Sequence, residues 1–199
     1  MNLKDKIKKF IFQGKKLKEI DKMRGHHGIK DGRILFRIAK SLKSNSVLVQ
    51  IGSYAGESTC FIAEGIGFKN CEFYCIDTWY NDAMEHHARK GEDVFGEFLR
   101  NVEPYRDKIL PMRGYSYEMI NKFPKQKKID FLFIDGNHSY EGVQRDIQDW
   151  IPLVKKNGIV CFHDYPEVLG VKRAVDEVIS DGTIRFIKAK NCLCIAKRN

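Results

Sequence analysis

Short apolar runs, most of them followed by a glycine or an aspartate, recur along this chain and constrain its fold more than any other feature. Helix-like stretches separate the runs, which show no regular alternation of polar and apolar side chains. Strands of this kind are typical of a parallel sheet that helices cover on both faces. The strand-like runs are 47–51, 72–76, 108–113, 129–134, 158–163, 183–188 and 192–197.

The stretches between these runs complete the pattern. Helical spacing of apolar residues is found at 3–20, 34–42, 57–66, 92–102, 116–122, 140–154 and 168–179. The last two strand-like runs flank a turn at Ala189-Lys190-Asn191, which predicts a closing hairpin with an antiparallel edge. We therefore predict a Rossmann-like, doubly wound α/β fold with a mostly parallel seven-stranded sheet, a C-terminal antiparallel hairpin and additional N-terminal helices.

Composition excludes several other classes of protein. Hydrophobic residues make up 43% of the chain and aromatic residues 12%, which excludes a disordered chain. No run approaches the roughly 18 apolar residues of a membrane span, and Phe10-Ile11-Phe12 is too short for the core of a signal peptide. The six cysteines form no CxxC pair, and five lie in apolar stretches, which favours core thiols over zinc ligands or disulfides. We expect a soluble cytoplasmic protein in a reducing compartment.

The net charge of +9 is concentrated near the N-terminus. Residues 1–43 hold 14 Lys/Arg against 4 Asp/Glu, whereas residues 44–199 hold 21 against 22. We therefore expect a basic helical extension over 1–43 and a main domain over 44–199. The first helix is amphipathic, and its apolar stripe needs a partner because a helix of this length is marginal alone in water. Its own domain, a second subunit in a homodimer and an anionic surface are the alternatives, and docking on protein is favoured.

Glycine and acidic residues follow the first strands at the positions where ligands bind in such sheets. Gly52-x-x-x-Gly56 lies between a strand and a helix and would let a ligand approach the backbone. Its spacing differs from the NAD-type glycine motif, because Tyr54 replaces the second glycine. Asp77 ends the next strand, where a carboxylate can accept both hydroxyl groups of a ribose. Together these features favour an adenosine-type ligand.

Two aspartates and two histidines follow the later strands. Asp135 and Asp164 end strands expected to be neighbours, and two carboxylates there repel each other unless a cation lies between them. Mg²⁺ or a similar divalent cation suits such oxygen ligands and would lower the pKa of a substrate hydroxyl. The alternative is that Asp135 contacts the cofactor and Asp164 caps the following loop. His138 and His163 compete for the role of general base.

Five stretches of the chain form motifs in a fixed order. They read Val-Leu-Val-Gln-Ile-Gly-Ser-Tyr-Ala-Gly-Glu-Ser-Thr at 47–59, Ile-Asp-Thr-Trp at 76–79, Phe-Ile-Asp-Gly-Asn-His-Ser-Tyr-Glu-Gly-Val at 133–143, Asp-Trp-Ile-Pro-Leu-Val at 149–154, and Gly158 to His163-Asp164-Tyr165. In this order and spacing they resemble class I S-adenosylmethionine-dependent methyltransferases. The resemblance is to the small bacterial O-methyltransferases related to catechol and macrocin O-methyltransferases, a group often associated with sugar and polysaccharide pathways, and it covers residues 44 to about 196.

The resemblance implies a cofactor site. S-adenosylmethionine would contact Gln50, Gly52, Ser53, Gly56, Ser58, Thr59, Asp77, Thr78, Tyr115, Ser116 and Asp135. The glycine loop would line the methionine end, Asp77 would hold the ribose, and Ser116 would hydrogen-bond on the adenine side. Gln50 stands where the family usually has an acidic residue, and its neutral amide cannot offset the charge of the cofactor's ammonium group.

The resemblance also bears on the metal and the base. In the catechol-type enzymes two aspartates at the positions of Asp135 and Asp164, plus an asparagine, hold a metal. Tyr165 follows Asp164 here, so His163 or Asn137 would have to supply the third ligand, or the metal would be absent. His138 stands where those enzymes keep a lysine base. The catalytic candidates are therefore His138, His163 and Asp135, and the metal candidates are Asp135 and Asp164.

The sequence therefore predicts a methyltransferase that acts on a hydroxyl of a small molecule. A sugar or glycan intermediate is the leading substrate class, and the basic N-terminus would steer in an acidic or phosphorylated one. The alternative is an RNA or ribosome methyltransferase, against which the neutral main domain argues, so nucleic acid is not the favoured partner. A non-enzymatic interaction module is a third alternative, and the converging acid–base groups argue against it. His26-His27 is expected to be a solvated turn and His86-His87 part of a lid.

Overall fold

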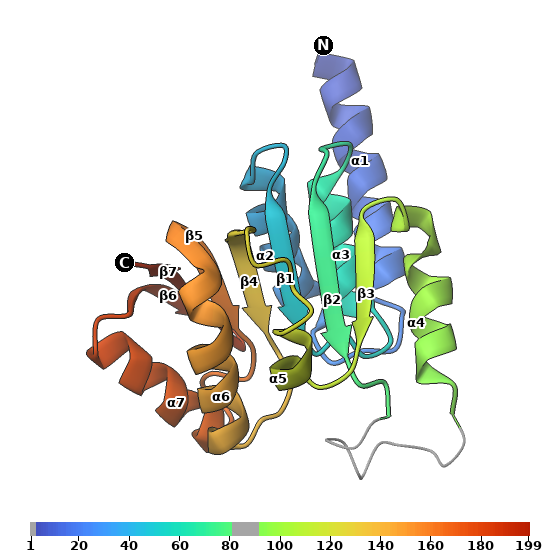
Figure 1. The fold of residues 1–199 in the computed structure, drawn as a ribbon. Helices are drawn as coiled ribbons and strands as arrows, with labels where there is room; N and C mark the ends of the chain where they lie inside the picture. The colour runs from blue at the N-terminus through green and yellow to red at the C-terminus, as the bar shows by residue number, and fades with distance from the viewer. Residues whose placement is uncertain (1–2, 81–91) are drawn as a thin grey trace.

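The computed structural model describes residues 3–80 and 92–199 and contains a seven-stranded sheet with helices on both faces (Figure 1). The strand order is β3-β2-β1-β4-β5-β7-β6, in which β1 to β5 run parallel and β7 is antiparallel to both of its neighbours. The strands are β1 (Val47–Ile51), β2 (Glu72–Asp77), β3 (Ile109–Arg113), β4 (Ile129–Ile134), β5 (Val154–Phe162), β6 (Ile184–Lys190) and β7 (Leu193–Arg198). The predicted fold class is confirmed, including the closing hairpin.

Helices α1 to α4 pack on one face of the sheet and α5 to α7 on the other (Figure 1). They are α1 (Leu3–Ile20), α2 (Gly28–Ser41), α3 (Glu57–Ile66), α4 (Val94–Val102), α5 (Ser116–Met119), α6 (Tyr140–Trp150) and α7 (Leu169–Ser180), with single 3₁₀ turns at Glu103–Tyr105 and Ile151–Leu153. Helix α2 begins six residues before its predicted start. Strand β5 also begins early, because the 3₁₀ turn after α6 leads directly into it.

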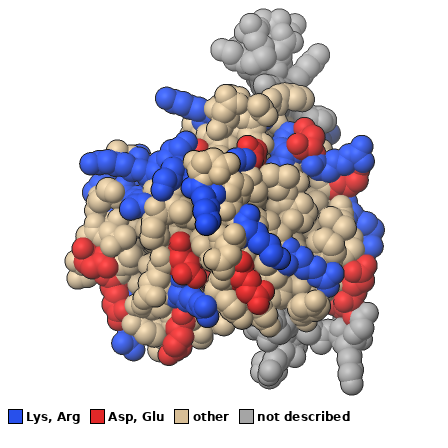
Figure 2. All heavy atoms as spheres, in the orientation of Figure 1, with Lys and Arg blue, Asp and Glu red and all other residues tan. Residues whose placement is uncertain are grey.

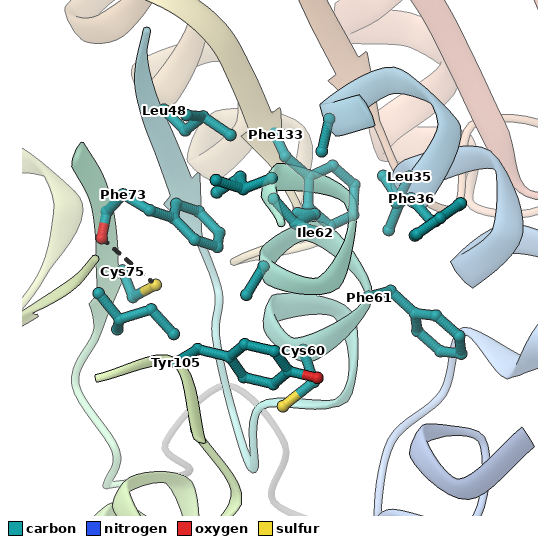
Figure 3. Packing of buried hydrophobic residues seen from close by; sticks show 14 of the residues in the cluster. Leu35, Phe36, Leu48, Cys60, Phe61, Ile62, Phe73, Cys75, Tyr105 and Phe133 are labelled. Atoms are coloured by element: carbon teal, nitrogen blue, oxygen red, sulfur yellow. Dashed lines mark hydrogen bonds between the residues drawn. The ribbon is translucent and has the colours of Figure 1, made fainter. Parts of the chain in front are cut away.

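The two central strands explain why the sequence lacks a polar alternation. Every residue of β1 is buried, and successive side chains of a strand point to opposite faces. Leu48 on β1 and Phe133 on β4 enter the core under α2 and α3 (Figure 3), whereas Val49 and Leu132 enter the core on the other face. Both faces are apolar and covered, so the strand sequences are continuously apolar.

Helix α1 docks on its own domain through its C-terminal half. Leu17 is 6% exposed and Ile20 is 2% exposed, and both belong to the core that α2, α3 and α4 share. Lys16 adds an ion pair of 2.8 Å with Glu64 on α3. The N-terminal half of α1 extends beyond the sheet (Figure 1). The division of the chain at residue 43 stays a prediction. In the part of the chain that is described, no helix is both long enough and apolar enough to cross a membrane.

Glycine determines how closely α2 and α3 approach each other. A Cβ atom on Gly65 of α3 would lie 2.3 Å from the carbonyl oxygen of Phe36 on α2. We expect Gly65→Ala to push the helices apart and to lower the free energy of unfolding by roughly 1–3 kcal/mol, measured by urea denaturation. Gly14→Ala in α1 is the matched control, because nothing lies within 4 Å of its Cβ position, and it should be neutral or stabilising by up to about 1 kcal/mol. Equal urea midpoints for Gly65→Ala and the wild type would contradict this account of the packing.

Candidate active site

A cavity of about 800 Å³ lies at the C-terminal ends of the parallel strands. The turns after β1 to β5 line it, together with the segment between α1 and α2. Most residues predicted for the site line this one cavity: Gly52, Ser53, Gly56, Ser58, Asp77, Thr78, Tyr115, Ser116, Asp135, His138, His163 and Asp164. The structure therefore brings the predicted cofactor residues and the predicted acid–base residues to a common space.

The turns after β1 and β4 lie in direct contact. Gly52 has φ +83°, and a Cβ atom there would lie 1.9 Å from the carbonyl oxygen of Asp135. The Asp135 amide donates to the carbonyl of Ile51 at 2.9 Å. A side chain at position 52 would separate the two turns, so this glycine is what places Asp135 beside the glycine loop.

Asp77 fixes the backbone of the glycine loop. Its Oδ2 accepts hydrogen bonds from the amides of Ser53 at 2.9 Å and Tyr54 at 2.8 Å, and its Oδ1 accepts one from the amide of Trp79 at 2.6 Å. The Asp77 carboxylate also lines the cavity. Its role as the ribose ligand stays a prediction.

Gln50 and Thr59 lie beneath the loop rather than in the cavity lining. Both are fully buried, and Thr59 Oγ1 donates to Gln50 Oε1 at 2.9 Å. Gln50 Nε2 donates to Ser58 Oγ at 2.7 Å and to the carbonyl of Gly52 at 3.0 Å. These bonds hold the loop and the start of α3 together, so any contribution of Gln50 and Thr59 to cofactor binding would act through the loop.

Asp146 on α6 is a cavity residue that the sequence analysis missed. It is 3% exposed, and its Oδ1 accepts a hydrogen bond of 2.5 Å from Ser116 Oγ, the residue predicted for the adenine side. Burial raises the pKa of the Asp146 carboxyl to about 7, and the hydrogen bond from Ser116 opposes this only in part. The Asp146 carboxyl therefore changes its protonation state around neutral pH.

The prediction of a solvated turn at His26-His27 is wrong for His27. The His27 side chain is only 8% exposed, and its Nε2 lies 2.7 Å from Asp135 Oδ2. Its backbone amide donates to Glu57 Oε2 at 3.2 Å. The docking of α1 and α2 folds the intervening segment against the strand ends, so a contact forms across 108 residues of sequence. His86-His87, predicted to belong to a lid, lies outside the described residues.

His163 is enclosed by carboxylates. Its Nδ1 lies 3.2 Å from Asp135 Oδ1 and 3.1 Å from Asp164 Oδ2, and its Nε2 lies 3.7 Å from Asp31 Oδ2. Burial opposes protonation, but the interactions with these three aspartates outweigh it and raise the pKa of His163 to about 12. Burial likewise opposes protonation of His27, but mainly the charge of Asp135 raises the pKa of His27 to about 9. Burial would raise the pKa of Asp135, yet the two imidazolium groups hold it well below its usual value.

His138 differs from the two buried histidines. Its side chain is 45% exposed, and its Nε2 lies 3.3 Å from Asp164 Oδ2 and 3.9 Å from Asp135 Oδ1. A protonated His163 has no lone pair with which to accept a proton at neutral pH, whereas His138 is open to a molecule in the cavity. Of the two predicted bases, the geometry therefore favours His138.

Long-range contacts hid part of the site from sequence analysis. His27 lies before α2, Asp31 lies on α2 and Glu57 begins α3. No spacing in the sequence connects them with Asp135. The sequence held one signal for this packing, the glycine at position 25. In the structure a Cβ atom on Gly25 would lie 1.9 Å from Glu57 Oε2. The glycine beside the two histidines therefore allows this segment to lie against α3.

The chain resembles known proteins over more than half of its length. A family model described as a methyltransferase domain matches residues 49–165. The uncharacterized protein y4gI of Sinorhizobium fredii is 29% identical over 119 residues, which cover 59% of this chain and 13% of that protein. The uncharacterized protein R132 of Acanthamoeba polyphaga mimivirus is 27% identical over 147 residues, which cover 70% of this chain and 62% of that protein. The chain thus spans less than two thirds of either relative.

Solved structures share the fold at low sequence identity. An O-methyltransferase from Bacillus cereus in complex with SAH gives a TM-score of 0.67 at 12% identity, over 96% of this chain and 90% of that chain. The SAH-bound methyltransferase PaMTH1 of Podospora anserina gives a TM-score of 0.68 at 15% identity, over 100% of this chain and 97% of that chain. At this level of identity the likeness shows a common fold.

The raised pKa of Asp146 predicts a pH-dependent stability. Its folded-state pKa lies above the unfolded value, so its contribution is fully present below about pH 3.8 and is lost as the pH rises through about 7. Asp146→Asn removes this dependence, and between pH 5 and pH 8 the variant should gain roughly 1–3 kcal/mol in free energy of unfolding relative to the wild type. Urea denaturation at several pH values measures it, with Asp107→Asn at an exposed position as the control. A constant difference between Asp146→Asn and the wild type across this range would refute the assignment.

Proposed function

Because the chain belongs to the methyltransferase domain family, we propose that it transfers the methyl group of S-adenosylmethionine to a hydroxyl oxygen of a small molecule. The observation that carries the proposal is that the two predicted sets of residues line one common cavity. The glycine loop and Asp77 occupy one part of its lining, and Asp135, His138 and Asp164 occupy another. The SAH-bound state of two proteins with the same fold supports the choice of cofactor.

The cofactor would lie across the first strand ends. Its methionine end would follow the glycine loop, whose backbone Asp77 already fixes, and the ribose hydroxyls would reach the Asp77 carboxylate. The adenine would lie towards Tyr115 and Ser116 after β3. Ser116 is held by Asp146, so the adenine side has a polar anchor with a definite position.

Methyl transfer needs an oxygen nucleophile in line with the bond between the cofactor's methyl carbon and its sulfur. When bound, the cofactor would supply the methyl carbon to the attacking acceptor oxygen and keep the electron pair of the broken carbon–sulfur bond on sulfur, and the His138 imidazole would take the hydroxyl proton. Asp164 at 3.3 Å would stabilise the imidazolium that forms. The remaining contribution of the protein is alignment of the two reactants and exclusion of water.

Asp135 and Asp164 are the carboxylates that would hold a divalent cation in this cavity. Together with His138 they offer three ligand atoms within 4.8 Å of one another, and carboxylate oxygens suit a divalent ion. When bound, such an ion would lower the pKa of the acceptor hydroxyl. The charge balance of the surrounding residues supports a bound cation. Four carboxylates there face only two imidazolium groups: Asp31, Glu57, Asp135 and Asp164 against His27 and His163.

The acceptor is best assigned as a neutral polyhydroxylated molecule, with a sugar or glycan intermediate as the leading class. Among the described residues, carboxylates outnumber guanidinium groups in the cavity lining, which disfavours a phosphorylated acceptor. On the face that Figure 2 shows, the largest group of lysine and arginine side chains lies at the upper left, away from the lower edge at which β1, β2 and β4 end. The charged lining residues are Glu57, Asp77, Asp135, Glu141, Asp146 and Asp164 against Arg24, Arg145 and the imidazolium groups of His27 and His163.

Removal of the Asp77 carboxylate tests the cofactor site. We expect Asp77→Ala to weaken S-adenosylmethionine binding by roughly 1–3 kcal/mol, because the ribose loses a charge-assisted acceptor and the loop loses its anchor. Isothermal titration calorimetry measures the affinity, and Asp107→Ala at an exposed position should leave it unchanged. Unchanged affinity in Asp77→Ala would remove Asp77 from the site.

A panel of hydroxylated compounds with methyl-labelled cofactor tests the reaction itself. Labelled product should form with a polyhydroxylated acceptor, and His138→Gln should lower kcat by roughly 10²–10⁴-fold while cofactor affinity is retained. His26→Gln is the control for a histidine elsewhere in the lining. A His138→Gln enzyme with wild-type kcat would exclude His138 as the base, and label transferred to RNA alone would exclude a small-molecule acceptor.

A further inference from the structure

Two histidines, His163 buried and His27 with a largely buried side chain, contact the two oxygens of one carboxylate. His27 Nε2 lies 2.7 Å from Asp135 Oδ2, and His163 Nδ1 lies 3.2 Å from Asp135 Oδ1. One ligand atom from each of the three residues can be chosen so that all lie within 4.8 Å of one another. A metal ion with bonds of about 2.1 Å holds neighbouring ligand atoms about 3.0–3.4 Å apart, so this spacing needs only small side-chain adjustments.

Each of these histidines directs its other ring nitrogen towards a second buried carboxylate. His27 Nδ1 lies 3.6 Å from Glu57 Oε2, and His163 Nε2 lies 3.7 Å from Asp31 Oδ2. Both nitrogens are buried and lack a hydrogen-bond partner at these distances, and both outer carboxylates are 3% exposed. Metal-ligating histidines almost always direct the second nitrogen to a carboxylate, a carbonyl or water, which fixes the ring and strengthens the ligand. Here both second nitrogens face such a carboxylate, at distances slightly longer than a hydrogen bond.

We propose that His27, Asp135 and His163 form a site for a divalent transition-metal ion, with Glu57 and Asp31 as the outer acceptors that orient the two imidazole rings. These ligands replace the set of Asp135, Asp164 and His138 considered under the proposed function, and the proposal rests on that function only for the use that the ion would have in the reaction. Two imidazoles and one carboxylate favour Zn²⁺, Co²⁺ or Ni²⁺ over Mg²⁺, which prefers oxygen ligands alone. Three protein ligands leave coordination positions open for the oxygen of an acceptor.

The proposal differs from a carboxylate-based cation site in its use of His27. The alternative cluster in the cavity consists of Asp135, His138 and Asp164, and it does not include the segment before α2. The two clusters share Asp135, so substitution of that residue cannot distinguish them. Substitution of His27 and of His138 can distinguish the clusters, because each of these residues belongs to only one of them. Binding of the ion displaces one proton from each imidazolium nitrogen that becomes a ligand, so the metal and the protons compete for the same positions.

The test uses the full chain after chelator treatment and dialysis. Titration with Zn²⁺ and with Mg²⁺, followed by calorimetry, should show one Zn²⁺ site that binds at least 100-fold more tightly than Mg²⁺. His27→Ala and His163→Ala should each weaken Zn²⁺ binding at least 100-fold, and Glu57→Gln should weaken it about 10–100-fold. His26→Ala, adjacent in the chain, and His138→Ala should retain the wild-type affinity. Thermal melting of each variant identifies any that fail to fold, and His27→Asn then replaces His27→Ala.

Substitution of Co²⁺ gives a readout that is independent of affinity. Paramagnetically shifted ring N–H resonances should reveal two bound imidazoles in the wild type and one in His27→Asn. No Zn²⁺ binding, equal affinity for Mg²⁺, or loss of binding in His138→Ala but not in the His27 variants would each overturn the proposal. Calorimetry of S-adenosylmethionine on the same metal-free samples separates the two ideas, because the metal proposal can fail while cofactor binding, and with it the proposed function, is retained.

Discussion

The buried carboxylate of Asp135 is the constraint on which the site depends. The backbone of Asp135 lies against Gly52 and leaves no space for a side chain at position 52. This contact joins the turn after β4 to the turn after β1. The two carboxylate oxygens contact His27 and His163, which join the segment before α2 and the end of β5 to the same point. An ionised carboxylate that is removed from water must be paired, because an unpaired buried charge costs several kcal/mol. The turn after β4, the segment before α2 and the end of β5 are therefore held together by the requirement to pair one charge.

This arrangement makes the segment before α2 part of the candidate active site, because residues 24–27 line the cavity. Leu17 and Ile20 dock α1 on the core, and Gly65 allows α2 to lie close to α3. These packing contacts determine where His27 lies, and the ion pair with Asp135 then depends on them. Removal of one partner of a buried ion pair is commonly more damaging than removal of both, so the stability of α1 and α2 and the chemistry of Asp135 are linked.

The sequence predicted the parts of the structure that local patterns encode. Continuous apolar runs identified β1, β2 and β4 to within a residue, because strands buried on both faces tolerate few other residues. Residues directly after strands, such as Asp77 and Asp135, were placed correctly because the ends of parallel strands meet at one edge of the sheet. His27 was misplaced because glycines and polar residues around it are typical of a solvated turn. Its burial depends on the tertiary packing of α1 and α2, which no short window of sequence contains.

The same distinction separates the two ends of the cavity. The part of the cavity predicted to bind the methyl donor is built from the glycine loop and the neighbouring strand β2. Its polar contacts run between Asp77 and residues at most 24 positions away. The acid–base end combines side chains from the segment before α2, from α2, from α3 and from the ends of β4 and β5. A local motif can persist in many chains of one fold, because it needs only its own loop and strand. A cluster gathered from five elements depends on the whole packing of one particular chain. If the proposed roles hold, acceptor choice should therefore vary among proteins that share this fold more than the mode of cofactor binding does. The residues that distinguish this protein are to be sought around Asp135 rather than around Asp77.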